Sequence, residues 1–311
     1  MKLTIGTRGS ALAMTQARDI RRRLEALGHE IAIKVIKTTG DKDQKSPFAL
    51  VGAPGVFVRE IENALIEGQI DVAVHCYKDL PSVGPEELVI AAMPDREDQS
   101  DTLFMPVEAM AADGGFLPLA QGAQVGTASA RRIAFLKHER ADISTAVLRG
   151  NVPTRIAKLL AGEHDAIVLA TAGVRRLEAA AARGELEFSI PDGLLQHQLD
   201  PTRYVPAASQ GALALQVRKD DVNAHEVIAL LDKPTEHEAV RVERKLLALV
   251  DGGCQLPFGA WCRHAADGSL ELFSALERDG EVRRAEARGT DPESLAQEAF
   301  ATLLPELTGR A

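Results

Sequence analysis

The chain has 311 residues, of which 45% are hydrophobic and 26% are charged, and its net charge is −9. This length predicts two or three domains with cores of their own, and the acidic balance disfavours a general nucleic-acid binder. No apolar run is long enough to span a membrane, and the N-terminus shows no signal-peptide pattern. Three cysteines without CxxC spacing, together with scattered histidines, predict reduced thiols in a cytoplasm and no metal site.

The first part of the chain alternates apolar strands with helix-period stretches. Strands are expected at 2–7, 31–37 and 70–75, and helices at 10–28, where Ser10 is the N-cap, and at 56–68. A polar loop separates the second strand from the second helix. This βαβαβ order predicts an α/β fold with a mostly parallel sheet and helices on both faces.

A similar alternation of strands and helices begins near residue 124. Near residue 234 the expected arrangement of elements changes. The stretch 94–102 is expected to cross between two lobes, and a polar stretch at 192–206 leads to a strand at 211–218. Beyond it we expect a long helix in which Thr235 and Glu238 form a capping box, a hairpin around Asp279-Gly280 and a terminal amphipathic helix. These last elements predict a smaller α+β domain.

Two strand-to-helix turns echo each other along the chain. "IGTRGSALA" (5–13) and "VGTASARRI" (125–133) share a strand, a Gly-Thr pair and a serine-capped helix. Backbone N–H groups at such a helix start can bind an anion, although any α/β lobe contains turns of this kind.

Arginines gather where a helix start disfavours them. Arg131 and Arg132 fall in the first turn of the helix that Ser129 caps, at the positive end of its dipole. Arg8, Arg149, Arg155 and the pair Arg175-Arg176 occupy other strand ends and helix starts. Each alone fits a solvated surface residue. As a set they indicate a crevice for a ligand with several carboxylates or phosphates.

Asp79 and Cys254 each allow more than one interpretation of their role. Asp79 follows a buried strand in "VAVHCYKDLPS" (72–82), which fits both an Asx-turn residue and a carboxylate that stabilises a developing cation. Cys254 lies in the glycine turn "DGGCQLPFG" (251–259), where it could serve a disulfide, a metal or a nucleophile. The cysteine count and spacing weaken the first two uses.

Seven stretches in order resemble the porphobilinogen deaminase (hydroxymethylbilane synthase) family. They are "GTRGSALAMTQA", "HCYKDLP", "GTASARR", "LRGNVPTR", "LATAGVRRL", "PAASQGALAL" and "DGGCQLPFG", and they extend from residue 4 to about residue 260. Seven motifs in one order are a highly specific match.

The resemblance implies a transferase of tetrapyrrole biosynthesis. It would add four porphobilinogen units head to tail, with loss of ammonia, to a dipyrromethane held by a thioether bond on Cys254, and then release hydroxymethylbilane. The implied fold has two periplasmic-binding-protein-like lobes with mixed, mostly parallel sheets and a small α+β domain. The implied domains are 1–98 with 208–229, 99–207, and 230–311. We expect a cytoplasmic monomer without nucleic-acid or membrane partners.

The resemblance also implies residue roles. Asp79 matches the catalytic carboxylate and Cys254 the attachment site. The remaining matches would bind the carboxylates of cofactor and substrate, and they are Arg8, Ser10, Gln16, Lys78, Thr127, Ser129, Arg131, Arg132, Arg149, Arg155, Gly173, Arg176 and Gln210.

The chain departs from the family pattern at a few positions. Leu50 and Pro54 stand where bacterial relatives often have lysines, Cys76 where serine is common, Ser209 for a frequent glycine and Gln216 for a frequent glutamate. The main alternative is a non-catalytic two-lobed anion-binding protein, which would explain the arginines but neither Asp79 nor the thiol of Cys254. A nucleic-acid binder is a third possibility, and the net charge and few aromatics count against it.

Overall fold

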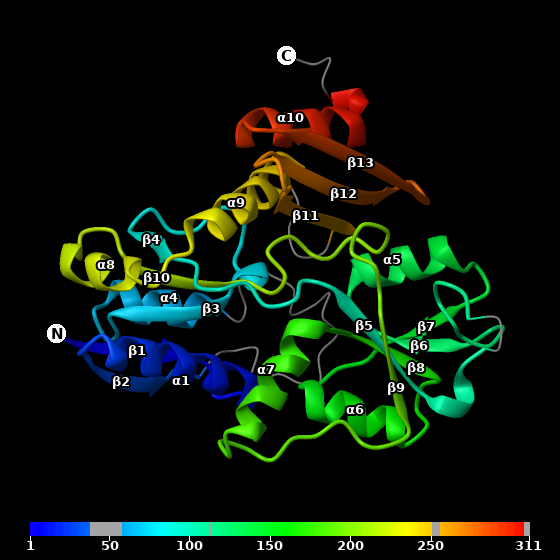
Figure 1. Ribbon diagram of the computed structural model, residues 1–311, viewed down its shortest axis with the longest axis horizontal. Coiled ribbons are helices and arrows are strands. Elements are labelled where there is room, and N and C mark those ends of the chain that lie inside the picture. The colour runs from blue at the N-terminus through cyan, green and yellow to red at the C-terminus, as the bar shows by residue number, and fades with distance from the viewer. Residues whose placement is uncertain (38–57, 112–113, 251–255, 308–311) are drawn as a thin grey trace. The chain divides into compact units, whose positions relative to one another are not determined.

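The computed structural model describes residues 1–37, 58–111, 114–250 and 256–307 (Figure 1). The chain forms two compact units, one of residues 1–97, 175–187 and 211–238 and the other of residues 98–174, 188–210 and 239–311. We call them the N-terminal unit and the arginine unit. Helices α7 (Thr171–Ala182) and α9 (Pro234–Leu249) each contribute residues to both. The division into three domains at the boundaries given above stays a prediction.

The N-terminal unit is built on one mixed sheet. Its elements are β1 (Lys2–Thr7), α1 (Ala11–Ala26), β2 (Glu30–Val35), α4 (Arg59–Ile66), β3 (Val72–Cys76), the 3-10 turn η1 (Tyr77–Asp79), β4 (Leu88–Ala92), β10 (Leu213–Arg218) and α8 (Val222–Ala229). Within the described residues, the strand order is β2-β1-β3-β10-β4, and β10 runs antiparallel to both of its neighbours. The predicted strand at 211–218 therefore returns to the first sheet.

Alternation along the strands buries both faces of this sheet. Val72 and Val74 of β3 join the core under α1 and α8, whereas Ala73 between them packs with α4 on the opposite face. The prediction of helices on both faces is confirmed.

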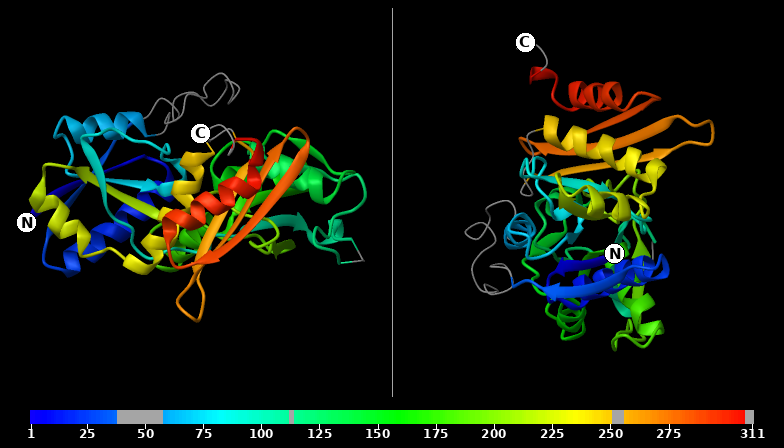
Figure 2. Two further views of the ribbon diagram at one scale, coloured as in Figure 1. Left: turned by 90° about the horizontal axis from the view of Figure 1, so that it is seen from above. Right: turned by 90° about the vertical axis from the view of Figure 1, so that its left-hand side faces the viewer.

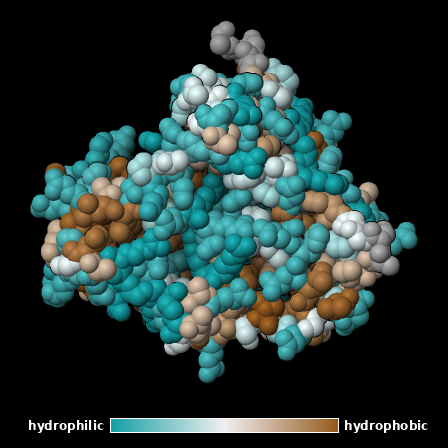
Figure 3. Space-filling model, viewed as in Figure 1, coloured by the Kyte–Doolittle hydropathy of each residue, from teal (hydrophilic) through white to brown (hydrophobic). Residues whose placement is uncertain are grey.

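The surface of the protein is mostly hydrophilic on the face drawn in Figure 3. The large apolar side chains that are exposed include Val83 and Leu230.

A buried polar chain in this unit explains Gln216. Its Nε2 donates to Glu62 Oε1 at 3.1 Å, and its Oε1 lies 3.1 Å from His75 Nε2. Burial lowers the pKa of His75 to about 4 and raises the pKa of Glu62. An amide supplies one donor and one acceptor, whereas a glutamate here would place a second carboxylate against Glu62.

The arginine unit repeats the same sheet. Its first elements are β5 (Asp101–Pro106), the 3-10 turn η2 (Val107–Ala109), β6 (Gln124–Gly126), α5 (Ala130–Glu139), β7 (Ser144–Ala146), α6 (Val152–Leu160), β8 (Ala166–Ala170) and β9 (Leu194–Gln198). The described strands are ordered β7-β6-β8-β5-β9, with an antiparallel strand in the fourth position as in the first sheet. Ser10 caps α1 and Ser129 caps α5, so the two echoed turns are equivalent elements of two similar sheets.

A second, smaller sheet completes the arginine unit. It consists of β11 (Phe258–His264), β12 (Leu270–Arg278) and β13 (Glu281–Gly289), followed by α10 (Pro292–Leu303) and the 3-10 turn η3 (Pro305–Leu307). Helix α10 lies along this sheet and shares its core with α9 (Figure 2). The predicted hairpin around Asp279-Gly280 is confirmed, since both residues have positive φ, 56° and 86°.

Close packing explains why residue 259, the last of "DGGCQLPFG", is a glycine. A Cβ added there would lie 2.6 Å from Val205 O, and Ala260 N donates to Pro206 O at 3.0 Å. Only a residue without a side chain lets β11 approach that backbone so closely.

Two local expectations are corrected by the structure. Helix α9 begins at Pro234, so Thr235 lies inside its first turn and is not the residue that precedes the helix. Strand β9 lies within the polar stretch 192–206, because pairing with β5 gives this half-buried edge strand its place without an apolar run.

Ser209 occupies a conformation that favours glycine. Its φ is 65°, and its side chain is fully buried, with an Oγ that has no hydrogen-bond partner among the described residues. Its backbone N–H donates to Glu243 Oε2 at 2.6 Å, a bond that needs no side chain. The frequent glycine of the family therefore fits this backbone better than serine does.

We predict that Ser209→Gly stabilises the fold by about 1 kcal/mol, because it relieves the left-handed strain and removes an unsatisfied hydroxyl. Calorimetry should show a higher unfolding temperature. The matched control is Ser274→Gly, since Ser274 is also buried but lies in β12 and donates to Ala285 O at 3.1 Å; this change should destabilise. An unchanged or lower unfolding temperature for Ser209→Gly would contradict the strain.

Candidate functional site

One group of predicted residues surrounds the end of β3 in the N-terminal unit. Gln16 of α1 is 3% exposed, and its Nε2 donates to Cys76 Sγ at 3.2 Å. Lys78 and Asp79 follow directly in η1, where both are half-buried. Arg176 of α7 lies close enough for its charge to act on the same thiol. The predicted catalytic carboxylate thus shares its surroundings with three predicted binding residues.

These charges keep Cys76 neutral. Burial raises the pKa of its thiol, and the negative charge of Asp79 raises it further, against the opposing effects of Arg176, Gln16 and Lys78. A protonated thiol is a weak nucleophile, so Cys76 acts here as a hydrogen-bond partner of Gln16.

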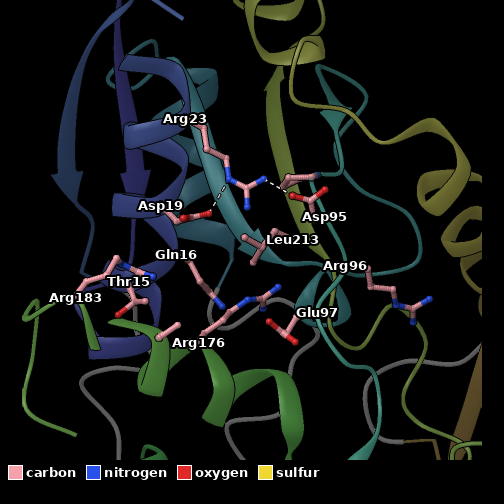
Figure 4. A pocket seen from close by; sticks show the side chains of 12 residues that line it. Thr15, Gln16, Asp19, Arg23, Asp95, Arg96, Glu97, Arg176, Arg183 and Leu213 are labelled. Atoms are coloured by element: carbon pink, nitrogen blue, oxygen red, sulfur yellow. Dashed lines mark hydrogen bonds and ion pairs between the residues drawn. The ribbon is translucent and has the colours of Figure 1, made fainter. Parts of the chain in front are cut away.

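A pocket in this unit extends from Gln16 and Arg176 to a set of ion pairs (Figure 4). Arg23 contacts Asp19 at 2.9 Å and Asp95 at 2.7 Å, which balances its charge. Arg176 instead donates from Nη2 to the uncharged carbonyl of Gly211 at 2.5 Å, and burial lowers its pKa. Its positive charge is therefore less compensated than that of Arg23 and is better suited to an anionic ligand.

Arg8 and Ser10 occupy the turn between β1 and α1. Arg8 is half-buried beside the end of the strand. The Ser10 side chain accepts from Ala13 N at 3.3 Å and so serves its own helix as N-cap. The turn has the backbone form predicted for it, with the serine oxygen already engaged as an acceptor.

The second group of predicted residues lies in the arginine unit and is organised by Asp101. This residue begins β5 and is fully buried. Arg131 Nη2 donates to its Oδ2 and Arg132 Nη2 donates to its Oδ1, each at 2.7 Å. The carboxylate compensates two cations that the helix dipole disfavours, which explains arginines in the first turn of α5.

The guanidinium groups of this pair keep unused donors. Arg131 Nη1 donates to Val205 O and Arg132 Nη1 to Val168 O, both at 2.8 Å. The Nε atoms of both arginines are buried, and neither has a hydrogen-bond partner within the described part of the chain. An unsatisfied buried donor costs about 1–3 kcal/mol, and these Nε atoms are closed to solvent and to a ligand. The pair instead fits a cofactor that carries acetate and propionate groups through its charge, because two guanidinium groups are opposed by one carboxylate.

Other predicted residues surround this pair. Burial and the charge of Arg132 lower the pKa of Arg155 to about 10, and its Nε donates to Gly150 O at 2.8 Å. The Thr127 hydroxyl accepts from Ser129 N at 3.3 Å, and Ser129 Oγ caps α5 by accepting from Arg132 N at 3.5 Å. Arg149 is half-buried after β7. Cations thus concentrate at this end of the sheet.

Gln210 and Gly173 are the remaining predicted site residues that the structure describes. Gln210 is buried, and its Nε2 donates to Asp101 Oδ1 at 2.9 Å, so it contacts the arginine pair through the carboxylate. Gly173 lies in α7. Cys254, Leu50 and Pro54 lie outside the described residues.

Asp101, the buried partner of three predicted site residues, is what sequence reasoning missed. It appears in "QSDT" as one acidic residue among several, and its partners are about 30 positions away in the chain. The sequence contained one signal for it. Two arginines in the first turn of a helix are electrostatically unfavourable, so their presence predicts a carboxylate nearby.

Comparison with known families decides the identity of this arrangement. Residues 3–226 match the family model described as "Porphobilinogen deaminase, dipyromethane cofactor binding domain", and residues 237–305 match its C-terminal domain. The chain belongs to the porphobilinogen deaminase family. The family, its hydroxymethylbilane synthase activity on porphobilinogen and its dipyrromethane cofactor were all predicted from the sequence, and the match confirms them.

Curated relatives agree over nearly the whole chain. The porphobilinogen deaminase of Syntrophobacter fumaroxidans is 40% identical, across 93% of this chain and 89% of its own length. That of Rubrobacter xylanophilus is 37% identical across 97% and 94%. Among solved structures, the L-cystine solute receptor of Neisseria gonorrhoeae is similar with a TM-score of 0.41 and 14% identity, across 78% of this chain and 90% of its own. In the part of the chain that the structure describes, no helix is long and apolar enough to cross a membrane.

We predict that Cys76 of the folded protein reacts slowly with iodoacetamide at pH 8, because burial and Asp79 raise its pKa and reduce the thiolate fraction. Asp79→Asn should speed this reaction by removing one cause of the raised pKa. Peptide mass spectrometry distinguishes Cys76 from the other thiols, and the same protein in denaturant is the control. Equal labelling rates in the folded and denatured protein would contradict the assignment.

Proposed function

We propose that this chain assembles hydroxymethylbilane from four porphobilinogen units on a dipyrromethane attached to Cys254, with Asp79 as the catalytic carboxylate. The observation that carries the proposal is the pair of Arg131 and Arg132, whose two positive charges are opposed by the single carboxylate of Asp101. The excess positive charge is suited to the carboxylates that each pyrrole ring carries.

In this proposal the arginines hold the polyanionic chain. Arg131 and Arg132 bind carboxylates of the cofactor, while Arg8, Arg149, Arg155 and Arg176 bind those of the incoming and growing rings. The polar residues Ser10, Gln16, Lys78, Thr127, Ser129, Gly173 and Gln210 complete these contacts. Local positive charge also raises the concentration of an anionic substrate near a protein whose net charge is −9.

Asp79 supplies a fixed negative charge for the chemical step. Loss of ammonia leaves positive charge on the pyrrole of the substrate, and a carboxylate near its N–H lowers the energy of that cation. The bound dipyrromethane supplies the nucleophilic ring carbon at which the chain grows. Asp79 is half-buried and follows Cys76, the partner of the buried Gln16, so it is partly shielded from water, which strengthens the electrostatic effect.

The proposal also covers the organisation of the protein. The chain acts as a cytoplasmic monomer with three domains at the boundaries predicted above. It uses no nucleic-acid partner. Its substrate is a small, soluble dicarboxylic acid, for which neither a membrane nor a second subunit is needed.

We predict that Asp79→Asn keeps its covalent cofactor but loses about 100-fold or more of its turnover, because the change removes the charge and keeps the shape. Ammonia release and porphobilinogen consumption measure the rate, and the wild type should release one ammonia for each porphobilinogen consumed.

The matched control is Asp71→Asn, because Asp71 precedes the opposite end of β3, where it accepts from Thr4 N at 2.8 Å. This variant should lose some stability and keep its turnover. Near-normal consumption by Asp79→Asn would remove Asp79 from the chemistry, and a wild type that consumes no porphobilinogen would refute the proposed function.

A further inference from the structure

The buried carboxylate of Asp101 has a position that suits a role beyond compensating charge. Strand β5 lies between β8 and β9, so Asp101 begins an interior strand of its sheet. Its two oxygens accept from two different guanidinium groups at 2.7 Å each. One carboxylate thereby sets the spacing and the direction of two arginines.

The charges in this cluster do not cancel. Arg131 and Arg132, which are 4% and 6% exposed, bring two positive charges against one negative charge. Burial alone would raise the pKa of Asp101, but the two guanidinium groups outweigh it and hold the pKa well below its usual range. The carboxylate is therefore ionised at neutral pH, and the cluster retains one net positive charge in a buried place.

Each guanidinium group is held at two of its three nitrogens. The Nη2 atoms bind Asp101 and the Nη1 atoms bind backbone carbonyls. The ring of Tyr204 packs against the guanidinium group of Arg131, and its centroid lies 5.8 Å from the guanidinium carbon. Both groups are thus fixed before any ligand arrives, with the Nε–H of each as the donor that no described residue uses.

The same carboxylate is tied to the part of the chain that carries Cys254. Gln210 donates to Asp101, and the neighbouring Ser209 N donates to Glu243 of α9. Glu243 also accepts from Cys262 N of β11 at 2.8 Å. Glu243 lies in α9 and Cys262 in β11, the two elements on either side of the segment that contains Cys254. These hydrogen bonds, together with the Ser209–Gln210 peptide bond, connect both elements to Asp101.

We propose that Asp101 is a positioning residue for the cofactor: it fixes Arg131 and Arg132 so that their one excess positive charge is already in place when the carboxylates of the dipyrromethane bind. The inference rests on the proposed function. Without Asp101, two buried like charges repel each other, and the two guanidinium groups lose their fixed positions. Preorganised charges bind a charged group with less reorganisation than mobile ones.

The test follows cofactor loading rather than turnover. Wild type and Asp101→Asn are produced as apoproteins in a host that cannot make porphobilinogen, then incubated with porphobilinogen, and the adduct is measured by intact mass. All samples are kept well below their apoprotein unfolding temperatures, so that loading reports the site and not the folded fraction. We expect Asp101→Asn to load about tenfold more slowly or worse.

The matched control is Asp142→Asn, which removes a carboxylate that contacts Arg140 at 2.7 Å near the surface of the same unit. This variant should load at the wild-type rate. A second variant, Asp101→Glu, keeps every charge but displaces the carboxylate by one methylene group, so it should load more slowly than wild type but faster than Asp101→Asn. If Asp101→Asn does not fold, Asp101→Glu decides the question.

Equal loading of Asp101→Asn and wild type would overturn the inference and leave the proposed function intact. Equally slow loading of Asp142→Asn would overturn it too, because any lost ion pair would then suffice. If Asp101→Asn does not fold, wild-type loading by Asp101→Glu would overturn it. A wild type that gains no adduct would instead refute the proposed function itself.

Discussion

The ion pairs of one buried carboxylate with two arginines are the interaction on which the arginine unit depends. Burying an uncompensated charge costs several kcal/mol, and Asp101 lowers this cost for both Arg131 and Arg132. With it, two guanidinium groups stay rigid, and one positive charge remains in excess. That excess charge is the feature on which the proposed binding of carboxylates depends.

The two units of the chain use the same sheet for different tasks. In both, a strand leads through a Gly-Thr turn into a serine-capped helix. The arginine unit places the fixed cations Arg131 and Arg132 after this turn. In the N-terminal unit, Asp79 follows β3 and lies near Cys76. In the proposed function, the first unit binds carboxylates and the second stabilises a cation.

Much of this could be predicted from the sequence, because local patterns determine it. Apolar alternation gave the strands, Ser10 and Ser129 gave the helix starts, and Asp279-Gly280 gave the hairpin. The missed features depend on contacts between distant residues. Asp101 pairs across about 30 positions, β9 exists through pairing with β5, and the positive φ of Ser209 shows only in the folded backbone. Motifs identified the candidate site residues, whereas the partners that hold them came only from the structure.

The most direct test of the account is the intact mass of the protein purified from cells with normal tetrapyrrole synthesis. The account predicts a covalent adduct with the mass of two linked pyrrole units, located on the peptide that contains Cys254. The adduct should be absent from Cys254→Ala and present in Cys76→Ala. An unmodified wild-type mass, or an adduct that persists in Cys254→Ala, would contradict it.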